Sequence, residues 1–88
     1  MKYGYDIRAV NSYPEIKVLA LKAEEYGFDS LHVNDHLIGF DPERKQPYLE
    51  AFALMSAIAV ETKRVKIGHV VLANSFRNPA LTAKIISS

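Results

Sequence analysis

Asn34, Asp35 and His36 are the consecutive residues in this sequence best suited to chemistry. They follow a short run of β-prone residues, so they stand where a buried strand should end. Imidazole titrates near neutral pH and can donate or accept a proton, and a neighbouring carboxylate can orient the ring. His36 is therefore the first catalytic candidate and Asp35 the second. The alternative is that His36 bonds only backbone at the strand end, and that Asp35 is an exposed cap of the following loop.

The same stretch raises the possibility of a metal site. His32, Asp35 and His36, with His69 further along the chain, offer imidazole and carboxylate groups that suit zinc or iron. In an extended strand His32 and His36 project to one face and Asp35 to the other, so convergence requires a bend. We therefore predict no metal ligands, and we expect His69 in the core or in a pocket wall. A small metal-binding α/β domain remains the weakest alternative.

The first half of the chain predicts a strand, a helix and a second strand. Tyrosine and β-branched residues predict a strand over about residues 2–8. Ser12 and Glu15 match a capping box at the start of a helix, and Gly27 can adopt the left-handed conformation that ends it. The second strand is expected over residues 29–33, directly before the polar residues described above.

A long loop and an apolar helix come next. Residues 34–47 include the charged run 41–45 and are expected to form an exposed, mobile loop, a kind of segment that is often functional. Residues 48–62 carry the strongest helix signal in the chain. Because only Glu50 and Ser56 are polar between positions 49 and 60, we expect this helix to be buried on more than one side, at a subunit interface.

A third strand and helix complete the pattern. The strand is predicted over residues 65–72 and its exit loop over 74–78. Asn78 is a suitable N-cap and Pro79 suits the first helical position, so the third helix should run from about there to Ser88.

The order βαβαβα implies a parallel α/β sheet with crossover helices. Ligands bind such sheets at the carboxyl ends of the strands, which is where Asp35 and His36 stand. Three strands alone leave two apolar edges unpaired. Either the chain is a fragment, or another chain completes its sheet.

Composition excludes several classes of protein. The chain has 88 residues, 49% hydrophobic and 24% charged, with a net charge of +1 and no basic stripe for nucleic acid. It has no cysteine, hence neither disulfides nor thiolate metal sites. Its first residues lack the apolar core of a signal peptide, because Asp6 and Arg8 interrupt the one candidate, and no apolar run reaches the roughly 20 residues that a membrane helix needs. We therefore expect a cytoplasmic protein with no nucleic-acid or membrane partner.

Three further motifs can be compared with known families. They are Ala-Glu-Glu-Tyr-Gly-Phe-Asp-Ser-Leu over 23–31, Asn-Asp-His-Leu over 34–37, and Lys-Ile-Gly over 66–68 followed by Asn-Ser-Phe-Arg-Asn-Pro-Ala over 74–80. Together they resemble the luciferase-like monooxygenase family, in particular its coenzyme F420-dependent branch. The resemblance covers essentially the whole chain. It implies an α/β fold in which residues 1–88 form a single segment, the first three βα units of a truncated TIM barrel.

The resemblance also implies a function. Such proteins transfer hydride, or oxygen, at an F420 or FMN cofactor, acting on paired donors or on CH–OH or CH–NH groups of a small organic substrate. Asp35 and His36 would lie beside the cofactor ring, with the histidine catalytic, and a non-prolyl cis peptide between Val70 and Val71 would back the ring. Asn74 could hydrogen-bond cofactor or substrate, although asparagine is also a common turn former.

Arg77 could reach a cofactor phosphate, although a surface arginine is the commoner case. Residues 48–62 and 79–88 resemble the helices of the family's dimer interface, which implies a homo-oligomer. A competing hypothesis is a non-enzymatic barrel segment whose main property is self-association through these helices.

Overall fold

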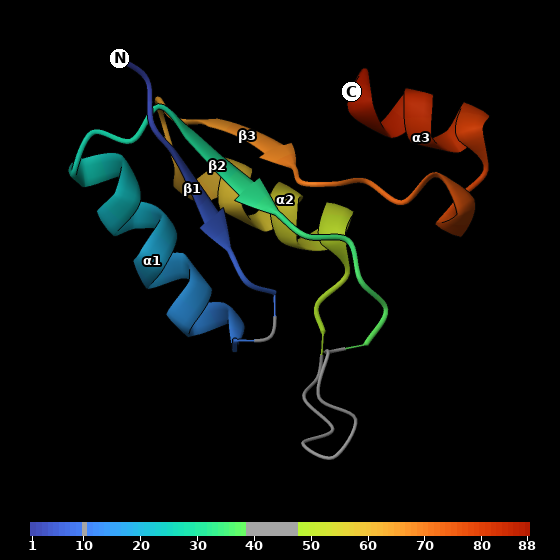
Figure 1. The fold of residues 1–88 in the computed structure, drawn as a ribbon, viewed down its shortest axis with the longest axis horizontal. Helices are drawn as coiled ribbons and strands as arrows, with labels where there is room; N and C mark the ends of the chain where they lie inside the picture. Colours follow the sequence, from blue (N-terminus) through green and yellow to red (C-terminus); the bar gives the residue numbers. More distant parts are fainter. Residues whose placement is uncertain (10, 39–47) are drawn as a thin grey trace.

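The computed structural model describes residues 1–9, 11–38 and 48–88. Strands and helices alternate along the chain, as predicted (Figure 1). The elements are β1 (Gly4–Ile7), α1 (Tyr13–Glu25), β2 (Ser30–Val33), α2 (Ala51–Glu61), β3 (Lys66–His69), a 3₁₀ turn η1 (Asn74–Phe76) and α3 (Pro79–Ile86).

The three strands form one parallel sheet in the order β1-β2-β3. Residues on neighbouring strands are in register, with Tyr5 opposite Leu31 and Leu31 opposite Ile67. Since side chains alternate along a strand, Leu31 and Val33 point to one face and His32 to the other.

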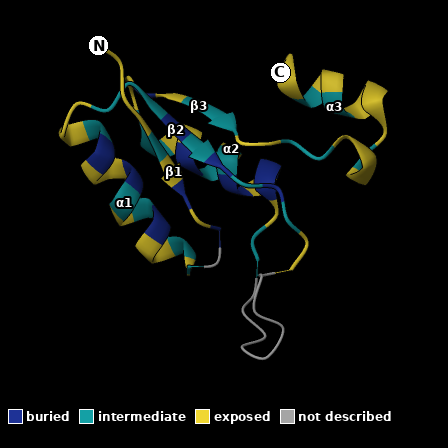
Figure 2. Ribbon diagram, in the orientation of Figure 1, coloured by how far each residue is buried: buried dark blue, intermediate teal, exposed yellow. Residues whose placement is uncertain are grey.

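Helices α1 and α2 contact each other and pack against the same face of the sheet. Dark blue buried positions recur along the sheet-facing side of α1 and along β2 (Figure 2). Fully buried aliphatic side chains from strands and helices form the core together. The largest of these are Ile7, Ile16, Leu31, Val33 and Ile58.

Helix α1 begins and ends as predicted. The Ser12 N–H donates to the Glu15 carboxylate at 3.0 Å, which is the returning half of a capping box. Gly27 has φ 88°, and its N–H donates to the Glu24 carbonyl. The left-handed glycine turns the chain back toward the sheet.

Glu24, near the end of α1, ties this helix to the start of β3. Its carboxylate accepts hydrogen bonds from the backbone N–H groups of Lys63, Arg64 and Val65. The Arg64 guanidinium donates to the carbonyls of Glu24 and Phe28. These bonds gather around one carboxylate because the α2–β3 turn passes the end of α1.

Two element boundaries differ from prediction by three residues. Helix α2 starts at Ala51, because Glu50 acts as N-cap and accepts a hydrogen bond from Ala53 N–H at 2.8 Å. Strand β3 ends at His69, whereas it was predicted to continue to residue 72. Of the predicted loop, residues 39–47 lie outside the described residues.

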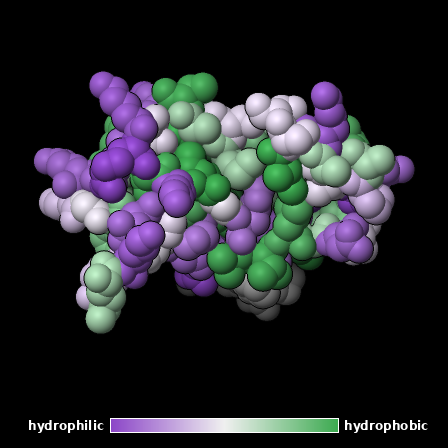
Figure 3. Space-filling model, turned by 90° about the horizontal axis from the view of Figure 1, so that it is seen from above, coloured by the Kyte–Doolittle hydropathy of each residue, from purple (hydrophilic) through white to green (hydrophobic). Residues whose placement is uncertain are grey.

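Apolar surface remains exposed on the outer helices. On α2, Phe52, Leu54 and Ile58 are buried, but Val60 is exposed. Helix α3 has no buried residue and lies apart from the sheet (Figure 1). When the molecule is viewed from above, an apolar band lies on its surface between the sheet and helix α3 (Figure 3). Within the described residues, no helix is long and apolar enough to span a membrane.

Candidate functional site

The carboxyl ends of β2 and β3 are joined by hydrogen bonds. The Val70 N–H donates to the Val33 carbonyl at 3.1 Å, which continues the parallel ladder. One residue further along β2, the Asn34 amide donates to the Val70 carbonyl at 2.9 Å. The two strand exits therefore lie side by side, as the parallel topology requires.

The peptide bond between Val70 and Val71 is cis, as the resemblance implied. Val70 supplies the carbonyl group of this peptide bond, and that carbonyl accepts the hydrogen bond from the Asn34 amide. The side chains of Val70 and Val71 are 47% and 75% exposed. An accessible apolar surface therefore lies beside the polar residues that follow β2.

Asp35 is buried, only 6% exposed, so the expectation of an exposed loop cap is wrong. Its Oδ2 accepts from Arg77 Nη1 at 2.6 Å and from the Ala73 N–H at 2.9 Å, and its Oδ1 accepts from Arg77 Nη2 at 2.9 Å. The Arg77 bond is the main cause that lowers the pKa of Asp35, with the Ala73 N–H adding to it against the effect of burial. The carboxylate is therefore ionised at neutral pH.

The Arg77 side chain is largely buried and paired with carboxylates, so it is not a solvated surface arginine. Its side chain is 14% exposed. Besides Asp35 it pairs with Glu50, the N-cap of α2, and its guanidinium stacks 4.8 Å from the centroid of the Phe52 ring. The bond to Asp35 chiefly raises the pKa of Arg77, so the cation is permanent.

His36 is half-buried beside Tyr48, which the sequence analysis did not single out. Their rings meet edge to face with centroids 5.4 Å apart. The Tyr48 hydroxyl lies 3.4 Å from Asn34 Oδ1, and burial raises the pKa of Tyr48. The signal that could have identified Tyr48 is its place at the end of the long loop that begins after His36.

The other two histidines lie within the strands, His32 on β2 and His69 at the end of β3. The His69 ring packs 4.8 Å from Phe52 and its buried Nε2 has no hydrogen-bond partner among the described residues, which fits a core or pocket wall. The His32 ring lies between two glycines on the adjacent strands: a Cβ at Gly4 would be 2.7 Å from His32 Cε1, and one at Gly68 3.7 Å from Cδ2. Within the described part of the chain, no cluster of three potential ligands could hold a metal ion.

Four of the five predicted site residues thus lie together, and the fifth lies further along the chain. Asp35, His36, Val70 and Val71 gather at the exits of β2 and β3. Asn74 begins η1 further along the exit segment and is exposed.

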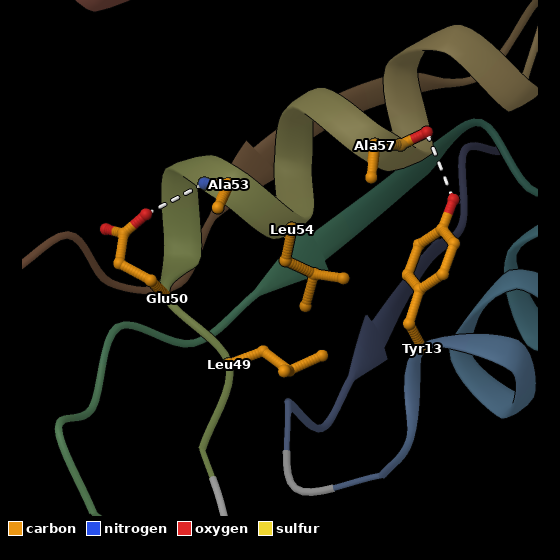
Figure 4. Close-up of a pocket in the computed structure, with 6 residues that line it drawn as sticks. All are labelled: Tyr13, Leu49, Glu50, Ala53, Leu54 and Ala57. Carbon is orange, nitrogen blue, oxygen red and sulfur yellow. Dashed lines mark hydrogen bonds between the residues drawn. The ribbon is translucent and has the colours of Figure 1, made fainter.

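A small pocket between α1 and α2 is distinct from this group (Figure 4). Its walls are mainly apolar, and its two polar side chains already have partners: the Tyr13 hydroxyl donates to the Ala57 carbonyl, and Glu50 caps Ala53. The pocket offers no unpaired group for chemistry. Its lining residues are Tyr13, Leu49, Glu50, Ala53, Leu54 and Ala57.

Three parallel βα units with both crossover helices on one face form a (βα)3 portion of a TIM (β/α)8 barrel. Residues 2–87 match the luciferase-like monooxygenase family, and the chain belongs to that family, as predicted.

The similar proteins include F420-dependent enzymes. The chain is 39% identical over 92 residues to an F420-dependent glucose-6-phosphate dehydrogenase of Gordonia bronchialis, and 40% identical over 91 residues to one of Amycolatopsis mediterranei. All of this chain aligns, and it spans 26% and 27% of those relatives.

A solved structure is also similar. It is an F420-dependent secondary alcohol dehydrogenase in complex with an F420-acetone adduct, with a TM-score of 0.86 and 30% identity. The match covers 96% of this chain and 26% of that one.

Proposed function

We propose that this chain forms the strand-exit part of the site of an F420-dependent oxidoreductase, which transfers hydride between the cofactor and a small organic substrate. The observation that carries the proposal is the group at the strand exits: Asn34 and Asp35 bond the segment that follows β3, and this segment exposes the apolar residues Val70 and Val71. Relatives and a structural neighbour whose names include F420 support this cofactor over FMN.

The residues present fit a planar tricyclic ring. Val70 and Val71 expose apolar side chains on which the face of such a ring could pack. His36 supplies a polar group at the edge of that surface, and Asn74 lies further along the same segment. When bound, F420 supplies a ring carbon that accepts or donates hydride. The site residues proposed for it are Asp35, His36, Val70, Val71 and Asn74.

We propose His36 as the catalytic acid or base. Hydride removal from a CH–OH group requires that the hydroxyl lose its proton, and a ring nitrogen of His36 could accept it; in the reverse direction the same nitrogen returns it. Tyr48, packed edge-on against the imidazole, would restrict its orientation.

The test is a titration of the purified protein with F420, followed by fluorescence, and then with FMN. We expect saturable F420 binding, weaker FMN binding, and F420 reduction in the presence of glucose 6-phosphate or a secondary alcohol. His36→Ala should abolish the reduction, whereas His32→Ala, the control whose ring lies between Gly4 and Gly68 of the neighbouring strands, should retain it. FMN-only binding with oxygen consumption would replace this proposal by a monooxygenase, and no binding of either cofactor would refute it.

We also propose a homo-oligomer formed through α2 and α3, because Val60, Leu81 and Ile86 present exposed apolar side chains there. The cytoplasmic location predicted from the sequence stays a prediction.

A further inference from the structure

The segment that follows β3 is held from two sides by consecutive residues of the β2 exit. Asn34 binds the Val70 carbonyl at 2.9 Å, at the start of the segment. Asp35 binds the Ala73 N–H at 2.9 Å and Arg77 through both carboxylate oxygens, at its end. The cis peptide lies between these anchor points.

Arg77 extends the same network to α2. One of its nitrogens bonds both Asp35 and Glu50, and its planar face lies over Phe52, so it joins the β2 exit, the β3 exit segment and the first turn of α2. Only the rigid fork of a guanidinium can make two parallel bonds to one carboxylate and stack on a ring as well. A lysine in its place would keep the charge and lose this geometry.

We propose that Asp35 and Arg77 are positioning residues, a clamp that holds the Val70–Val71 surface in a fixed place relative to His36. This inference rests on the proposed function, since the surface is where the cofactor ring would pack. It separates two adjacent residues by role: His36 carries the proton, and Asp35 acts on the reaction only through the segment that it holds. The permanent charge on both partners keeps the clamp closed throughout the neutral pH range.

The first measurement is amide hydrogen exchange without cofactor. Asp35→Asn and Arg77→Lys should each speed the exchange of Val71, Leu72 and Ala73, while the amides of α1 are unchanged. Arg64→Lys is the matched control, because that arginine bonds backbone carbonyls at the opposite end of the strands. Unchanged exchange in the segment would overturn the clamp, whether or not the protein binds F420.

The second measurement is F420 affinity and the pH profile of turnover. Asp35→Asn and Arg77→Lys should each weaken F420 binding by roughly tenfold to a hundredfold, as misplacement of a site does. The double variant should bind no more weakly than the poorer single one, because the two residues form one unit. The pH midpoint of kcat should stay at that of the wild type.

Two results would refute the positioning role. Loss of turnover and of its pH dependence in Asp35→Asn, with F420 binding unchanged, would make Asp35 the proton-transfer group. A lower Tm in both variants, with F420 affinity intact, would make the pair purely structural. Absence of F420 binding by the wild type would instead refute the proposed function and leave the exchange result to decide the clamp.

Discussion

At the scale of single residues, Asp35 and His36 are neighbours in the chain with different surroundings. Asp35 is buried against a guanidinium and a backbone N–H, which hold it as an anion. His36 is half-buried against an aromatic ring. Sequence motifs group the two residues as a pair, and their surroundings assign them different tasks.

The ion pair of Asp35 predicts a pH dependence of stability. Because Arg77 lowers the pKa of Asp35 in the folded state, its contribution is present above the unfolded pKa of about 3.9 and is lost as the pH falls through the folded value. The free energy of unfolding, measured by urea denaturation from pH 6 downward, should therefore fall more steeply below about pH 4 for the wild type than for Asp35→Asn. Equal slopes would show that Asp35 is not ion-paired in solution.

Gly4 leaves room for the His32 ring. A Cβ there would lie 2.7 Å from His32 Cε1 and 2.9 Å from Ser30 Oγ, so Gly4→Ala must displace both side chains; because these are side-chain ends that can move, it should lower the stability by no more than about 1 kcal/mol. Gly68→Ala is the control, since its Cβ would make an ordinary 3.7 Å contact with the same ring. Thermal unfolding measures the difference, and the NMR shifts of the His32 ring report the displacement. A Gly4→Ala protein as stable as the Gly68→Ala one would contradict the close approach.

At the scale of elements, the sheet is braced at both ends by carboxylates that bind backbone N–H groups. Glu24 does this where β3 begins, and Asp35 does it beyond the point where β3 ends. Both belong to the first half of the chain and both hold the second half. The chain is thereby held just before β3 and again after it.

Replacement of Glu24 tests the brace at the start of β3. The three backbone donors lower the pKa of its carboxyl, with the Val65 and Arg64 N–H groups the leading causes, so the carboxylate should stay ionised and bonded in the folded protein. Glu24→Gln removes the charge and should lower the Tm, whereas Glu25→Gln, on the exposed neighbour, should leave it unchanged. Similar melting curves for the two variants would mean that the α1–β3 contact contributes nothing measurable.

At the scale of the whole molecule, apolar surface remains exposed to solvent. The side chains of Leu81 and Ile86 on α3 are 55% and 63% exposed, and β1 and β3 each pair with β2 alone among the described strands. Surfaces of this kind favour contact with further protein.

We therefore expect self-association that depends on α3. Sedimentation equilibrium should show oligomers of the wild type, and Leu81→Glu with Ile86→Glu should shift the protein toward monomer, because burying the new charges is costly. Lys84→Glu is the control for added negative charge on the same helix. A monomeric wild type would refute the proposed oligomer.

The sequence by itself determined the kinds of element, their order, the family and the residues around the strand exits. Hydrophobic periodicity, the Ser12 capping box and the glycine after α1 act over a few residues, so they can be read locally. Boundaries were less well predicted, because apolar residues continue past His69, where β3 ends, and because the Glu50 cap that starts α2 is one polar residue in an apolar run.

Tertiary structure alone decided the roles of Asp35, Glu24 and Arg77. Asp35 meets Arg77 across 42 positions, and Glu24 meets the turn before β3 across 39 to 41. No local pattern encodes such pairs, because they exist only after parallel register has placed distant strand ends side by side. Burial then strengthens the pairing of Asp35 with Arg77, and a carboxylate that looked like a solvent-exposed residue becomes a fixed point of the site.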